Sequence, residues 1–277
     1  MEIDNEDFGS LFSDKETLKI MRENHKKAAE NNINGFEYWF PIIQKLKIPH
    51  PKSKMVDTPF EFIEGLFGRK SVVENSESFE GSVDSFMDGL VDQVIEFGNK
   101  YSYPIFMRNS LTSAKHSWEN TCFVPKNEGR EDFKRRIFTL SEAAMMGPSV
   151  APMKLVLREF IKTKPAFYAF HGNMPITEEY RLFFEDGKAI KWQPYWPVES
   201  IQDPSVENWK EELESISNPG EKLMSEMKKY ASLVTKELGG FWSVDFLIDI
   251  HGNPILIDMA NGNQSYQSPN AILFKEV

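Results

Sequence analysis

The sequence predicts an α+β fold in which antiparallel hairpins alternate with helices. Two stretches have the pattern of hairpins, because alternating apolar runs flank the turn signals "EDGK" and "HGN". Between them, residues 203–239 have helical spacing and end at two glycines, Gly239 and Gly240. This order is typical of α+β layers and not of a regular array of parallel strands joined by helices.

The composition limits the class of protein. The 277 residues are enough for one large domain with lobes or for two modest ones, and 22 phenylalanines supply an ample core. The net charge of −10 argues against a general binder of nucleic acid or of acidic membranes. The acidic start "MEIDNEDFGS" differs from a secretory leader, and no apolar run approaches a membrane span. One cysteine excludes an internal disulfide, so we expect a soluble cytoplasmic protein.

The remaining elements follow in order along the chain. Helical patterns cover residues 14–46, residues 82–101 and the stretch "REDFKRRIFTLSEAAMMG". Strands are predicted at "YPIFMRNS", which starts at residue 103, at "NTCFVPK" and at "MKLVLREFI". The stretch "KMVDTPFEFIEGLFG" is ambiguous between the two. The hairpin "EEYRLFFEDGKAIKWQPYW" precedes the second helical part of the chain.

The last hairpin, "VDFLIDIHGNPILIDMANGN" at residues 244–263, places two aspartates among aliphatic residues. If His251 and Gly252 form a two-residue turn, Asp245 lies directly opposite Asp258. A slip of the turn by one residue would pair Asp245 with Ala260, which still leaves it near Asp258. In either register, the hairpin brings two carboxylates together.

The two-residue turn also divides the hairpin into two faces. Leu247 would lie opposite Leu256 on the face of the aspartates. The other face would be a core face made of aliphatic and aromatic side chains, namely Val244, Phe246, Ile248, Ile255, Ile257 and Met259.

Two opposed carboxylates about 5 Å apart repel by roughly 3 kcal/mol, so something must offset this cost. A hard divalent cation does so directly, and Mg²⁺ prefers one or two carboxylates together with phosphate oxygens. The "NGN" after the second strand adds the amide oxygens of Asn261 and Asn263. A solvated face with two unrelated aspartates would explain the same residues, and the hairpin alone leaves both interpretations open.

Basic residues upstream favour the metal interpretation. Arg108 ends the strand "YPIFMR", and Lys115 lies in the loop that follows it. Arg158 and Arg181 lie inside otherwise apolar strands, where a charge usually marks the wet face. Cations from separate strands together with an acidic pair fit a nucleoside triphosphate with magnesium.

Taken in order, these motifs resemble the ATP-grasp superfamily over about residues 100–265. The motifs are "YPIFMR", "NSLTSAKHS", "KLVLREFI", "EEYRLFFEDGK" and the acidic hairpin. The chain is most similar to the cell division cycle 123 family and to small phage-associated ATP-grasp ligases. The resemblance implies an ATP-grasp fold with two α+β lobes that clamp ATP. We expect a mostly helical N-terminal region over 1–85, a small lobe over 86–158 and a large lobe over 159–277.

The resemblance also implies which residues bind the nucleotide. Arg108 should contact phosphate from its strand end, and Lys115 should lie over the phosphates from its loop. Arg181 should reach the γ-phosphate or its acceptor, so Arg181 and Lys115 are the candidate catalytic residues. The phosphate loop lacks the glycines of many relatives, which leaves more of the binding to Lys115. Backbone groups of three consecutive residues would read the adenine edge: Glu159, Phe160 and Ile161.

For the metal, the resemblance implies that Asp245 and Asp258 hold Mg²⁺ with Asn261 as the third ligand. The family spacing is acid-x-Asn, but position 260 is alanine here, and the asparagines are Asn261 and Asn263. The choice between these two asparagines stays open.

The leading functional hypothesis is therefore an ATP- and Mg²⁺-dependent carboxylate–amine ligase that works through an acyl phosphate. Its acceptor would be an amino acid, a peptide or a protein. The alternative is a nucleotide-binding assembly chaperone with a protein partner and no ligase chemistry, and a third possibility is a vestigial ATP site. The aromatic stretch "KWQPYWPVES" fits either hairpin-end packing or the wall of a substrate site.

Overall fold

A computed structural model describes residues 15–58, 76–145, 154–171 and 174–275. Within it the chain divides into two compact units, and each gathers segments that are far apart in the sequence. Unit 1 contains the described residues of Met1–Asn32, Lys54–Ala114 and Asn120–Leu157. Unit 2 contains those of Ile33–Ser53, Lys115–Glu119 and Arg158–Val277. Both units combine helices with a β-sheet, which confirms the α+β prediction; the three domain ranges expected from the sequence stay a prediction.

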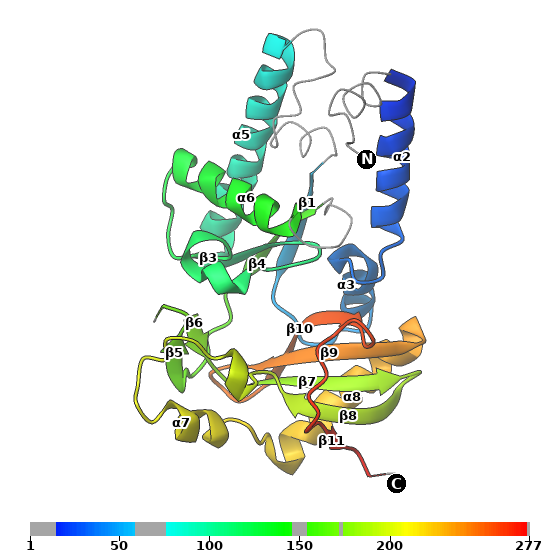
Figure 1. Ribbon diagram of the computed structural model, residues 1–277, viewed down its shortest axis with the longest axis vertical. Coiled ribbons are helices and arrows are strands. Elements are labelled where there is room, and N and C mark those ends of the chain that lie inside the picture. The colour runs from blue at the N-terminus through cyan, green and yellow to red at the C-terminus, as the bar shows by residue number, and fades with distance from the viewer. Residues whose placement is uncertain (1–14, 59–75, 146–153, 172–173, 276–277) are drawn as a thin grey trace, which may run out of the picture. The chain divides into compact units, whose positions relative to one another are not determined.

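The sheet of unit 1 has four strands in the order β1-β4-β2-β3 (Figure 1). The strands are β1 (Ser53–Asp57), β2 (Ile105–Asn109), β3 (Phe123–Val124) and β4 (Lys154–Glu159). The helices of this unit are α2 (Lys15–Glu30), α5 (Ser76–Tyr101) and α6 (Arg130–Met145). The helices and strands predicted in these stretches are therefore confirmed. The ambiguous stretch begins as strand β1, and its residues from 59 onward lie outside the described part.

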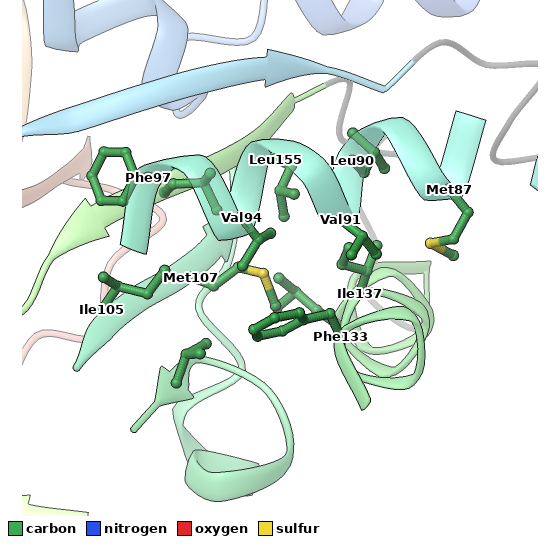
Figure 2. Close-up of a cluster of buried hydrophobic side chains, with 13 residues drawn as sticks. Met87, Leu90, Val91, Val94, Phe97, Ile105, Met107, Phe133, Ile137 and Leu155 are labelled. Atoms are coloured by element: carbon green, nitrogen blue, oxygen red, sulfur yellow. The ribbon is translucent and has the colours of Figure 1, made fainter. Parts of the chain in front are cut away.

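The core of unit 1 forms where one face of α5 packs against α6 and the sheet (Figure 2). The α5 side chains recur every three or four residues, which is the spacing that puts them on one helical face. The buried cluster from the three elements includes Met87, Leu90, Val91, Val94, Phe97, Ile105, Met107, Phe133, Ile137, Leu140, Leu155 and Leu157.

Two glycines of α5 offer a matched test of this packing. A Cβ built on Gly98 would lie 2.1 Å from Cζ of Tyr103, whereas a Cβ on Gly89 meets nothing within 4 Å. Gly89→Ala should therefore raise the free energy of unfolding by about 0.5–1 kcal/mol through helix propensity. Gly98→Ala should lower it by about 1–3 kcal/mol, because the Tyr103 ring must move. Urea unfolding of both variants checks this, and equal stabilisation by both would contradict the close contact.

Unit 2 is built on a five-stranded antiparallel sheet with the order β10-β9-β7-β8-β11. The strands are β7 (Glu179–Glu185), β8 (Lys188–Pro194), β9 (Phe241–Ile248), β10 (Pro254–Asn261) and β11 (Ile272–Leu273). The unit also contains α3 (Phe36–Lys45), α7 (Trp209–Ser215), α8 (Gly220–Leu238) and the short pair β5 (Phe167–Ala169) and β6 (Met174–Ile176). Helix α8 packs on β7, β8 and β9 (Figure 1).

Most elements of unit 2 follow the sequence predictions. The first hairpin turns at Asp186 and Gly187, which both have positive φ as a tight two-residue turn requires. The predicted helical stretch is divided into α7 and α8, and α8 ends before Gly239 and Gly240. The strands β5, β6 and β11 were not predicted, because each has at most three residues.

The β9–β10 hairpin confirms the pairing of the aspartates but not the predicted turn. Asp245 is the cross-strand partner of Asp258. The connection spans residues 249–253 instead of two residues, because the Asp249 carboxylate accepts backbone N–H groups of His251 (2.9 Å) and Asn253 (2.8 Å). These bonds stabilise a wider turn.

A β-bulge at Ile257 compensates for this wider turn. Leu247 pairs with Ile255 and not with Leu256, and the register shifts between Leu256 and Asp258. Because a bulge inserts one extra residue, it reverses the alternation of faces on its strand. The predicted core positions Ile255 and Ile257 are therefore wrong, and Leu256 is buried in their place. The other predicted core residues are buried as expected: Val244, Phe246, Ile248 and Met259.

The two faces of the sheet have different surroundings. The Tyr180 hydroxyl donates to the carbonyl of Ile216 (2.9 Å), which lies between α7 and α8. Tyr180 therefore points to the helical side, and its neighbours Glu179 and Arg181 point to the opposite face. Among the helices that the structure describes, none is long and apolar enough to cross a membrane.

Candidate active site

Four polar residues follow one another across the open face of the unit 2 sheet. Asp258 of β10 is the partner of Asp245 on β9, which is the partner of Arg181 on β7. Arg181 in turn is the partner of Gln193 on β8. We call these four residues the polar row; cross-strand partners lie on the same face, so the row gathers its charges in one place.

Arg181 and Asp245 form a two-point ion pair in the middle of the polar row. Arg181 Nε lies 2.8 Å from Asp245 Oδ1, and Nη2 lies 2.8 Å from Oδ2. Asp245 is only 4% exposed. Burial opposes the charge of Arg181, but Asp245 outweighs it and raises the pKa of the guanidinium. Arg181 therefore offsets the repulsion between the two aspartates in the described structure, a role that the sequence interpretation gave to a metal.

A second buried ion pair lies beside the polar row. Lys115 Nζ is 3.2 Å from Oε1 of Glu179, which is 4% exposed. Lys115 also lies over the ring of Tyr195, 4.6 Å from its centroid. Burial opposes the charge of Lys115, but Glu179, Tyr195 and Asp245 outweigh it and raise its pKa. Burial also raises the pKa of Glu179, although the charge of Lys115 limits that effect.

Glu179 is the functional candidate that sequence reasoning missed. It stands two residues before Arg181 in the E-[aromatic]-R pattern, so alternation puts both on one face. That pattern was the available signal. The contact between Glu179 and Lys115 spans 64 residues of sequence and could not be read from it.

Both ion pairs open onto a cavity of about 470 Å³ within unit 2. Its lining combines the two cations with aromatic rings and one further carboxylate. The residues that matter for its chemistry are Lys115, Arg181, Tyr195, Trp196, Glu199 and Tyr266. Its size lies in the range of pockets that bind small organic molecules. The aromatic stretch of the sequence therefore contributes to a cavity wall.

Arg158 belongs to the same unit but has a different place. Its Nη1 donates to the carbonyl of Ile257 (2.8 Å), and its guanidinium lies 5.3 Å from the ring centroid of Phe36. Ile257 is the extra residue of the bulge, so Arg158 binds the backbone that sets the position of Asp258. This arrangement fits a positioning role better than contact with phosphate.

The predicted hinge residues follow Arg158 at the end of β4. The backbone N–H of Glu159 donates to the carbonyl of Lys52 (2.9 Å), and its carboxylate accepts the Lys52 N–H (3.0 Å). The Phe160 ring packs edge-on against Trp118 at 6.2 Å. Ile161 is partly exposed. Because the Glu159 N–H already has a backbone acceptor, reading of an adenine edge would rest on Phe160 and Ile161.

Arg108 lies in unit 1, at the end of β2. It is buried, and its Nε donates to the carbonyl of Asn109 (3.0 Å). The Asn109 side chain then accepts the N–H groups of Leu111 (2.9 Å) and Thr112 (2.8 Å). These bonds shape the loop that leads to Lys115.

Asn261 is the least well placed of the predicted metal ligands. It lies three positions after Asp258, so strand alternation puts it on the opposite face of β10. Its Oδ1 accepts the N–H of Asn263 at 2.9 Å. Within the described residues no group of three or more His, Cys, Asp or Glu could hold a metal. Asp245 and Asp258 remain a pair of oxygen ligands of the kind that Mg²⁺ accepts when phosphate completes its shell.

Most of the chain matches a model of a known protein family. The model is described as an ATP-grasp domain, family 3 of its clade, and it matches residues 96–273. That match spans more than half of the chain and contains every predicted site residue. A comparison with curated protein sequences gave no match.

Solved structures with a similar fold have low sequence identity. The D-alanine–D-alanine ligase of Bacillus anthracis in complex with ATP is 11% identical, with a TM-score of 0.44 over 85% of this chain and 55% of that one. The N5-carboxyaminoimidazole synthase of Aspergillus clavatus, with ADP and its ribonucleotide, is 12% identical, with a TM-score of 0.44 over 84% and 45%. The ATP-grasp ligase PsnB with a minimal precursor is 10% identical, with a TM-score of 0.44 over 85% and 53%. The chain spans about half the length of these structures.

Proposed function

Because the chain belongs to this family of ATP-grasp domains, we propose that it is an ATP- and Mg²⁺-dependent carboxylate–amine ligase. One observation carries the proposal. Two buried cations, Lys115 and Arg181, line the cavity next to the facing carboxylates of Asp245 and Asp258. This is the set of charges that a triphosphate, its metal and a carboxylate acceptor require in one place.

The residues of the polar row divide the electrostatic work. Lys115 and Arg181 neutralise phosphate and acceptor oxygens, which otherwise repel each other. Asp245 and Asp258 hold Mg²⁺, whose chemistry is to polarise the phosphoryl oxygens. The Asn261 amide can add a third ligand when its oxygen leaves the Asn263 N–H. Arg108, Phe160 and Ile161 contribute phosphate and adenine contacts.

The position of Arg181 suggests how it serves two partners. Its guanidinium has five N–H donors, and the bonds to Asp245 account for two of them. In the structure Arg181 supplies the positive charge that Asp245 needs. With magnesium bound to the aspartates, Arg181 is released to contact the transferring phosphoryl group or the acceptor.

The proposed reaction has two steps. A carboxylate oxygen of the acceptor attacks the γ-phosphorus of ATP, and the bond to the β,γ-bridging oxygen breaks to give an acyl phosphate and ADP. An amine nitrogen then attacks the acyl carbon, inorganic phosphate leaves, and the nitrogen loses its proton. The product is a C–N bond. The acceptor is an amino acid, a peptide or a protein.

The first test is stabilisation by nucleotide. Mg-ATP at about 100 times its Kd should add about 2.7 kcal/mol to the free energy of unfolding, and ATP with a chelator should add less. A thermal melt with calorimetric titration measures both. The ligase is then tested by ADP release in the presence of carboxylate and amine panels.

The possible outcomes separate the alternatives. Binding of Mg-ATP without turnover for any acceptor would fit a nucleotide-binding chaperone with a protein partner instead of a ligase. An unchanged melting temperature with no heat of binding would contradict nucleotide binding itself.

A further inference from the structure

The aromatic walls of the unit 2 cavity are not used by the proposed chemistry of phosphate and metal. Tyr195 and Trp196 follow β8 directly, and their rings meet edge to face at 4.9 Å and 76°. Phe170 also packs against Trp196, with 6.1 Å between the ring centroids. Both Phe170 and Met174 extend the apolar lining. The walls therefore form a slot of flat and flexible apolar side chains.

Trp196 is held in this wall without a polar partner. It is 9% exposed, and no residue in the described part of the chain accepts a hydrogen bond from its buried Nε1. A buried N–H without an acceptor costs stability, so its presence calls for an explanation. A large flat ring surface beside the cavity supplies one.

The cationic end of the cavity touches the same rings. The guanidinium of Arg181 lies 4.9 Å from the centroid of Tyr195, and Lys115 Nζ lies 5.7 Å from the centroid of Trp196. The bond to Glu179 accounts for one of the three donors of Lys115, and Arg181 has donors beyond its two bonds to Asp245. A carboxylate bound here therefore meets donors at the point where its body begins to meet aromatic surface.

We infer that this cavity binds the carboxylate acceptor of the ligase and that the acceptor is an aromatic amino acid, free or at the end of a peptide. Its carboxylate faces Lys115 and Arg181, next to the polar row, and its ring lies against Tyr195 and Trp196. Aromatic rings favour edge-to-face and offset contacts with one another, which gives a flat ring an advantage over a small polar side chain. This inference rests on the proposed ligase function.

The experiment uses hydroxylamine as the amine, so that the natural amine need not be known. The acceptor carboxylate takes the γ-phosphoryl group and releases ADP; hydroxylamine nitrogen then attacks the acyl carbon, phosphate leaves, and a hydroxamate forms. The acceptors are L-phenylalanine and L-tryptophan, compared with glycine and L-glutamate. We expect kcat/KM for the aromatic acids to exceed that for the polar ones by about tenfold or more, as a fitted apolar pocket allows.

Variants of the wall locate the effect. Trp196→Ala should raise KM for L-phenylalanine by about tenfold or more while Trp196→Phe keeps most of the affinity. Tyr266→Ala, at a lining residue that is 52% exposed, should raise KM in the same direction without risk to folding. Tyr168→Ala removes an exposed ring on β5 outside the cavity and should leave all parameters unchanged. Calorimetry of Mg-ATP binding is measured for each variant.

Each outcome decides the matter. Hydroxamate formation that favours glycine or L-glutamate would overturn the inference and leave the ligase function in place. Mg-ATP binding without hydroxamate from any acid would overturn both. Weaker Mg-ATP binding in Trp196→Ala and Tyr266→Ala, by as much as the rise in KM, would overturn the inference because the cavity would then hold the nucleotide. Intact Mg-ATP binding with a selective rise in KM for the aromatic acids supports it.

Discussion

Replacing Arg181 by methionine should lower the free energy of unfolding by about 3–5 kcal/mol and abolish turnover. The physical reason is the buried carboxylate of Asp245, which would lose the partner that binds both of its oxygens. Removal of one member of a buried ion pair costs far more than removal of an exposed one, because the remaining charge has no compensation. Urea unfolding of the purified variant measures the loss.

A matched control makes this prediction specific. Arg135 binds Asp132 at 2.8 Å on the surface of α6, where the two side chains are 73% and 47% exposed. Arg135→Met should change stability by no more than about 1 kcal/mol, as exposed pairs do. The double variant Arg181→Met with Asp245→Leu should regain part of the stability, because no unpaired charge remains. Equal losses in Arg181→Met and Arg135→Met would contradict a structural role of the pair.

The pairing of the aspartates was predictable from the sequence, but for reasons that partly cancel. A two-residue turn at His251 and Gly252 predicts the observed partnership of Asp245 and Asp258. The real turn spans residues 249–253, which moves the register by one position, and the bulge at Ile257 moves it back. Alternating hydrophobicity specifies the faces of a regular strand, but it contains no signal for a bulge. The core face was therefore predicted correctly before the bulge on β9 and wrongly on part of β10.

Contacts between distant segments limited the prediction of the candidate site. Arg181 and Asp245 are 64 residues apart, and only the neighbourhood of β7 and β9 in the sheet brings them together. The sequence offered both residues as separate candidates, one for phosphate and one for metal. It could not show that they bind each other. For the same reason, the join of residues 115–119 to unit 2 was invisible, since chain order alone puts Lys115 with the strands of unit 1.

These contacts make the two aspartates unequal, although the sequence treats them alike. Asp245 is bound by Arg181 through both oxygens, while Asp258 is partly exposed at the next position of the polar row. Asp245→Asn should therefore destabilise the protein without nucleotide, because Arg181 loses a charged partner. Asp258→Asn should leave that stability unchanged or slightly higher, because it relieves repulsion between two facing carboxylates.

Asp258→Asn should nevertheless remove most of the magnesium-dependent stabilisation by ATP and lower turnover sharply. A neutral amide is a poorer ligand for a hard cation than a carboxylate, and the charge that offsets the metal is lost. The measurement is a set of thermal melts with ATP at increasing Mg²⁺ concentrations. Glu185→Gln removes an exposed carboxylate from the same sheet and serves as the control. A second change, Asp245→Asn, should add little to the loss of magnesium dependence, since both residues act on one ion. If Asp258→Asn responds to Mg²⁺ as the wild type does, the paired carboxylates do not hold the metal, and the aspartates of this hairpin would have only the structural role that Arg181 gives to Asp245.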